Sequence, residues 1–117
     1  MRRALLVAGL AVLVPAPAGA TPPPGRLQVV AREFSFALSR PKLKPGPAIV
    51  ELANFGEDAH DLRLRRVGGT RTYRIGAVQP GRQARLRLKL LRGRYLLWCS
   101  LADHRARGMQ ATLLVRR

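Results

Sequence analysis

Apolar side chains alternate with charged ones along several short segments of this chain, and this two-residue period restricts the fold more than any other feature. In residues 84–90 one alanine and three leucines would face one way, and two arginines and a lysine the other. Similar segments are predicted at residues 27–31, 34–38, 48–53, 62–65, 95–99 and 111–115. Turn sequences such as Asn54-Phe55-Gly56 and Pro80-Gly81 separate them, and long helical patterns are absent. The pattern predicts an all-β sandwich or barrel.

Some stretches are less regular. The apolar phase changes between residues 27–31 and 34–38, which indicates a bulge or bend near Arg32-Glu33. Residues 41–47 contain three prolines and are predicted to form a loop, whereas the type of the segment 70–78 stays open. Tyr95 is expected to close the core with its hydroxyl hydrogen-bonded, and Trp98 to face the opposite way.

The N-terminal residues have the composition of a secretory signal peptide. Arg2 and Arg3 precede an apolar run over residues 4–14, and the small residues 18–20 resemble a cleavage site. The run is shorter than the roughly 20 apolar residues of a membrane span. We therefore expect residues 1–20 to be a signal peptide, 21–26 a proline-rich leader and 27–117 a single domain; retention of the segment as an anchor stays open. The protein would be exported to the periplasm or the cell exterior.

The chain has one cysteine, which is unusual for an exported protein. In an oxidising compartment a cysteine usually forms a disulfide. A single cysteine cannot do so within its own chain, so an intermolecular bridge, a reactive thiol or a metal ligand remains.

Potential metal ligands are concentrated near the C-terminus. Cys99, His104 and Met109 lie five residues apart, and the only other histidine is His60. A thiolate, two imidazoles and a weak thioether are the donors of blue-copper electron-transfer sites. Met109 would be the weak axial donor, and Gly108 would relieve backbone strain before it.

The motif Asn54-x-Gly56-x3-His60, then Pro80-Gly81, then Gly93-x-Tyr95-x-Leu97-x-Cys99-x4-His104-x4-Met109 is similar to the plastocyanin/azurin-like cupredoxins. This resemblance covers residues 28–115 and implies a Greek-key β-sandwich with one type 1 copper. It implies His60, Cys99, His104 and Met109 as ligands, and His104 as the exit for electrons. It also implies a hydrogen bond from Asn54 to Ser100 that ties two ligand loops together.

The chain departs from this family beside His104. Ala102-Asp103 replaces a frequent Pro-Gly, and Arg105 and Arg107 follow the histidine where the family usually has apolar residues. We expect these arginines to favour electrostatic docking, and Asp103 to pair with one of them.

The formal net charge of +16, from 22 Lys and Arg against 6 Asp and Glu, would attract acidic partners and anionic membrane surfaces. A solvated surface that reflects a genome-wide bias toward arginine explains the charge equally well, so its meaning stays open. The leading hypothesis is a monomeric exported carrier of single electrons, with Cu(I)/Cu(II) as cofactor, between redox proteins such as a cytochrome and an oxidase or reductase. The alternative is a non-redox protein that binds copper and delivers it to another protein. A third hypothesis is an interaction module that has lost its copper function. We expect no enzyme activity, because four protein donors leave no position for a substrate, and no nucleic-acid partner, because the chain is exported.

Overall fold

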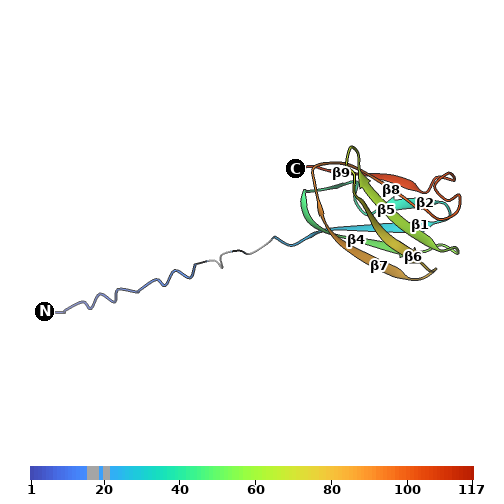
Figure 1. The fold of residues 1–117 in the computed structure, drawn as a ribbon. Coiled ribbons are helices and arrows are strands. Elements are labelled where there is room, and N and C mark those ends of the chain that lie inside the picture. The colour runs from blue at the N-terminus through green and yellow to red at the C-terminus, as the bar shows by residue number, and fades with distance from the viewer. Residues whose placement is uncertain (16–18, 20–21) are drawn as a thin grey trace.

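The structure, a computed structural model, describes residues 1–15, 19 and 22–117, and in this part the regular structure is entirely β (Figure 1). The strands are β1 (Gly25–Arg32), β2 (Ser35–Leu38), β3 (Lys42–Leu43), β4 (Gly46–Asn54), β5 (His60–Arg66), β6 (Thr72–Val78), β7 (Gln83–Leu90), β8 (Gly93–Trp98) and β9 (Gln110–Val115). They form two sheets with the orders β2-β1-β4-β7 and β3-β9-β8-β5-β6. The expected sandwich is confirmed.

Both sheets are mixed. β1 runs parallel to β4, and β3 runs parallel to β9, while the other pairs are antiparallel. Consecutive residues of a strand point to opposite faces, so one face of each sheet meets the other sheet and one meets water. The alternation in β7 follows this rule: Leu88 and Leu90 are buried, and Arg87 and Lys89 are exposed.

The core lies between the two sheets. Leucine and valine side chains from both sheets fill it, together with Tyr95, Cys99 and Met109. The Tyr95 hydroxyl accepts a hydrogen bond from the backbone amide of Leu91 at 2.9 Å, which confirms the expected role of this residue. Cys99 and Met109 therefore sit at one end of an apolar interior.

The structure corrects two details of the sequence prediction. Residues 33 and 34 form a tight turn between β1 and β2, with Arg32 opposite Ser35, rather than a bulge or bend in one continuous strand. The turn reverses the chain direction, so large apolar residues still recur at every second position in β2, but they fall on even-numbered positions instead of the odd-numbered positions of β1. The predicted loop at residues 41–47 contains the short strand β3, because Lys42 and Leu43 pair with the end of β9. The uncertain segment 70–78 contains β6.

Residues 1–15 contain no helix or strand. Among the described residues, no helix has the length and apolar character needed to cross a membrane. Ala18 and Ala20 of the expected cleavage site lie outside the described residues, so the signal peptide remains a prediction.

Candidate metal centre

The metal-binding candidates lie at the end of the sandwich where four connections meet. These connections join β1 to β2, β4 to β5, β6 to β7 and β8 to β9. His60 is the first residue of β5, and Cys99 directly follows β8. His104 lies in the long connection from β8 to β9. We call this end, defined by residues 33–34, 55–61, 79–82 and 99–109, the metal end.

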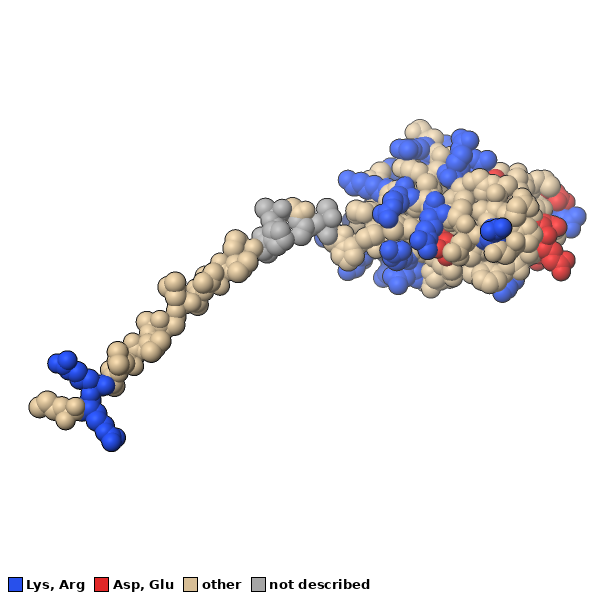
Figure 2. Space-filling view, turned by 90° about the horizontal axis from the view of Figure 1, so that it is seen from below, with Lys and Arg blue, Asp and Glu red and all other residues tan. Residues whose placement is uncertain are grey.

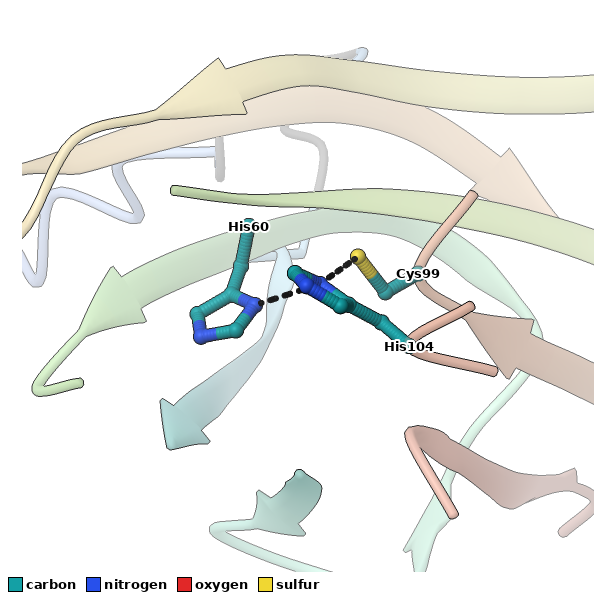
Figure 3. A group of neighbouring side chains, drawn as sticks. All are labelled: His60, Cys99 and His104. Atoms are coloured by element: carbon teal, nitrogen blue, oxygen red, sulfur yellow. Dashed lines mark hydrogen bonds between the residues drawn. The ribbon is translucent and has the colours of Figure 1, made fainter. Parts of the chain in front are cut away.

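Three of the four predicted ligands converge there (Figure 3). One donor atom each of His60, Cys99 and His104 lies within 4.8 Å of the other two, and all three residues are buried. The Nδ1 atoms of the histidines are 3.3 Å apart, and Cys99 Sγ is 3.5 Å from His104 Nδ1. Nitrogen and sulfur donors that surround one metal tetrahedrally at about 2.0–2.3 Å lie roughly 3.3–3.6 Å from each other. The spacing therefore fits a single small metal ion.

Glu33 fixes the orientation of the His60 ring. Its Oε1 lies 2.9 Å from His60 Nε2. Since an ionised carboxylate only accepts hydrogen bonds, Nε2 carries the proton, and a neutral ring then presents the lone pair of Nδ1 to the cluster. Ligating histidines commonly donate their second ring N–H to a carboxylate in this way. The sequence analysis did not identify Glu33.

The same carboxylate also organises the connection from β4 to β5. Glu33 Oε1 accepts hydrogen bonds from the backbone amides of Asp58, at 2.7 Å, and Glu57, at 2.8 Å. The bond from Asp58, with those from His60 and Glu57, lowers the pKa of Glu33 to about 2. A Cβ at Gly56 would clash with this carboxylate, so a larger residue there would displace Glu33 from its present position.

The connection from β8 to β9 brings Cys99, His104 and Met109 together. The backbone amide of Cys99 donates to the carbonyl of Met109, and the amide of Met109 donates to the carbonyl of His104, both at 3.1 Å. Gly108 has φ +115°, a backbone conformation that residues other than glycine rarely adopt, so the turn before Met109 favours glycine. Met109 is fully buried in the core cluster. Its role as a fourth ligand stays a prediction.

Burial raises the pKa of the Cys99 thiol. A metal that binds this sulfur must therefore displace a proton. Two imidazoles and a thiolate suit copper or zinc, whereas magnesium and calcium prefer oxygen donors. The chemistry of the cluster thus agrees with its spacing.

The expected link between Asn54 and Ser100 needs correction. The Asn54 amide donates to the carbonyls of Asp58, at 2.7 Å, and Val78, at 2.9 Å, and its oxygen accepts from the Gly56 amide at 2.8 Å. Asn54 therefore ties its own loop to β6. Ser100 is held instead by Asp61.

Asp61 is a buried carboxylate that the sequence analysis missed. It accepts a hydrogen bond from the Ser100 amide at 2.6 Å and another from the Ser100 hydroxyl. Arg63 Nε lies 3.5 Å from the same carboxylate. Because Asp61 follows His60 and Ser100 follows Cys99, this pair joins the two segments that carry these candidate ligands. The sequence did offer a signal for Asp61: it is one of only six acidic residues in the chain, and it lies next to the candidate ligand His60.

The predicted docking residues Arg105 and Arg107 follow His104 in the chain and stack on aromatic rings. Arg105 lies 4.7 Å from the centre of the Trp98 ring, and Arg107 lies 4.8 Å from that of Phe34. Arg107 Nε also donates to Asp103 at 2.8 Å, which confirms the expected ion pair. Phe34 in turn packs against the His104 ring, with centres 4.9 Å apart. His104 is 8% exposed, so only a small part of it reaches the surface.

No protein-family model matches the chain, and no curated protein matches it by sequence. Solved structures do match. An auracyanin from Roseiflexus castenholzii has a TM-score of 0.65 at 15% identity over 85% of this chain and 100% of its own. Auracyanin A from Chloroflexus aurantiacus, described as a "blue" copper protein, has a TM-score of 0.65 at 13% identity over 80% and 100% of the two chains. A purple cupredoxin from Nitrosopumilus maritimus gives 0.54 at 18% identity over 75% and 97%.

At these identities the similarity concerns the architecture of the chain. It extends over nearly the full length of each of these three proteins, so the match includes both sheets rather than a shared fragment. The expected Greek-key β-sandwich is confirmed, and the chain has the cupredoxin fold.

Proposed function

We propose that this protein binds one copper ion at the metal end and carries single electrons between redox partners. The observation that carries the proposal is the convergence of the His60, Cys99 and His104 donors within 4.8 Å, in a buried cluster on a cupredoxin fold. Met109, which the backbone hydrogen bonds hold next to Cys99 and His104, would supply the weak fourth donor.

The chain contributes rigidity. Glu33 holds the His60 ring, Asp61 holds the residue after Cys99, and two backbone bonds close the loop around His104 and Met109. A bound copper would supply one-electron chemistry, alternating between Cu(I) and Cu(II). Because the donors are fixed by groups outside the cluster, they need to move little when the charge changes. Burial of all three excludes water from the centre.

His104 is the proposed exit for electrons, because it is the donor that reaches the surface. Phe34 packs on its ring, and Phe55, 63% exposed, belongs to the same end. Arg105 and Arg107 would contact a partner through the parts of their guanidinium groups that face solvent. The ion pair between Arg107 and Asp103 reduces the net charge that a partner would meet there.

The test is the visible and EPR spectrum of the copper-loaded protein. We expect an intense absorption near 600 nm that disappears on reduction and returns on oxidation, and that is absent in Cys99→Ser. Met109→Leu is the matched control, since it removes only the weak donor: colour should remain, with a higher reduction potential. A protein that loses copper on each reduction would contradict electron transfer and favour copper delivery.

Export and the domain limits belong to the same proposal. We infer that residues 1–20 direct export, that residues 21–26 are a leader and that residues 27–117 act as a monomeric domain. The apolar run with two preceding arginines supports this inference. N-terminal sequencing of the protein recovered from the cell envelope tests it: a start at Thr21 is expected, and a start at Met1 would indicate an anchor.

A further inference from the structure

The end of the sandwich opposite the metal end carries a groove of about 410 Å³ with basic walls. It lies where β3 and β9 finish and where the chain enters β1. Five basic residues line it, together with prolines that include Pro22 and Pro23: Arg40, Lys42, Lys44, Arg116 and Arg117. All five are exposed. We call these five residues the basic end.

Acidic side chains gather mainly at the end of the domain away from the N-terminal segment, whereas basic side chains are spread over the domain (Figure 2). Five of the six acidic residues belong to the metal end, and the sixth, Glu51, pairs with Arg85 within the β2-β1-β4-β7 sheet. Within the described part of the chain, no residue of the basic end forms an ion pair. The two ends are about 26 Å apart, from the nine residues of β4 and a rise of ~3.3 Å per residue. Since screening at physiological salt acts over about 8 Å, the basic end attracts anions regardless of the acidic residues.

The N-terminal segment enters the domain at this same end. Pro22 and Pro23 line the groove, and the apolar run ends at Val14. The eight residues from Val14 to Pro22 span at most about 28 Å. While the run is in a membrane, the basic end is therefore the part of the domain held near the lipid. Cleavage after Ala20 would leave a new terminal ammonium group there, which adds a positive charge.

We propose that the basic end docks on an anionic lipid surface, with lipid phosphates in the groove and the metal end directed away from the bilayer. Clusters of lysine and arginine beside an apolar segment bind anionic headgroups through summed electrostatic attraction. The orientation leaves His104 and its surroundings open to a partner. The proposal rests on the proposed export for the part played by the N-terminal segment, but it requires no copper, so its test is separate from that of copper binding.

Sedimentation with lipid vesicles tests the proposal on the purified protein, with and without copper. We expect binding to phosphatidylcholine vesicles that contain 30% phosphatidylglycerol, little binding to pure phosphatidylcholine, and release by salt. The double variant Lys44→Gln/Arg117→Gln should weaken binding by about tenfold or more at low salt. Arg32→Gln/Arg82→Gln, which removes the same charge at or beside the metal end, should bind within twofold of the unchanged protein. Lys42→Gln/Arg116→Gln provides a second pair if the first is unstable.

The single tryptophan reports the orientation, because Trp98 ends β8 beside the metal end. Brominated acyl chains, which quench only at short range, should leave its fluorescence unchanged on binding. If the double variants at the basic end and at the metal end lost vesicle binding equally, net charge alone would cause the binding and the proposal would be wrong. Quenching of Trp98 would show the opposite orientation. Equal binding to neutral vesicles, or binding to duplex DNA without binding to vesicles, would also overturn the proposal.

Discussion

The two ends of this sandwich use charged side chains in opposite ways. At the metal end, Glu33, Asp61 and Asp103 each bind a partner within the protein: the His60 ring, the segment after Cys99, or an arginine. At the basic end, residues such as Lys44 and Arg117 are exposed and, within the described chain, have no ion-pair partner. The comparison indicates that charge builds a fixed structure at one end and is available to other molecules at the other.

Burial explains the difference most directly for Asp61. A carboxylate that leaves water must find hydrogen-bond donors, and it then ties together the segments that supply them. Asp61 is 2% exposed and joins β5 to the segment after β8. An exposed lysine keeps its water and needs no partner. Substitution of the metal-end carboxylates that hold other groups, Glu33 and Asp61, should therefore change stability or metal binding, whereas substitutions at the basic end should change only association.

The largest effect is expected for Asp61→Ala. It leaves the Ser100 amide without its acceptor and leaves Arg63 without its carboxylate, so the free energy of unfolding should fall by about 2–4 kcal/mol. Denaturant unfolding of the copper-free protein measures this change. Asp58→Ala is the matched control, because Asp58 is exposed, and it should lie within about 0.5 kcal/mol of the unchanged protein. Equal effects would mean that Asp61 does not join the two segments.

Glu33→Gln comes next. The glutamine keeps the shape but loses the charge that holds the His60 ring, and loss of such a partner typically lowers metal affinity by about 10–100-fold. Competition with a copper chelator measures the affinity. Glu57→Gln removes the same charge from the neighbouring loop without touching His60, and it should bind copper as before. If the two variants bind copper equally well, Glu33 does not position the ligand.

A smaller effect is expected for Gly56→Ala. The added methyl group would clash with the Glu33 carboxylate and displace it from its hydrogen bonds to the loop, which should destabilise the protein by about 1–2 kcal/mol. Gly76→Ala in β6 is the control, since a Cβ there meets nothing within 4 Å. Thermal unfolding of the two variants compares them directly. An unchanged Gly56→Ala protein would show that the loop tolerates a displaced Glu33.

Local patterns predicted most of the fold and the three converging donors. Alternation located the strands, and the scarcity of sulfur and imidazole groups singled out Cys99, His104 and His60. The partners of these residues are harder to predict, because they come from distant parts of the chain. Glu33 precedes His60 by 27 residues, and only the turn between β1 and β2 carries it to the ring.

Asp61 illustrates a second reason. Strict alternation would place Asp61 in water and His60 in the core, yet both are buried, because the pairing of β5 with β6 shifts between His60 and Leu62. A shift of this kind depends on the neighbouring strand and leaves no pattern of its own. The distribution of charge behaves similarly: composition gives the net charge of +16, but the gathering of five of the six acidic residues at the metal end follows from topology.

The smallest effect on stability is expected at the basic end. Lys44→Ala removes an exposed ammonium group without an ion-pair partner in the described chain, so the free energy of unfolding should change by no more than about 0.5 kcal/mol. Denaturant unfolding at low and high salt measures it. The same variant should still weaken binding to anionic vesicles, which separates association from stability in one side chain. A loss of stability as large as that of Asp61→Ala would mean that the basic end, too, is held by its charges, and the contrast between the two ends would disappear.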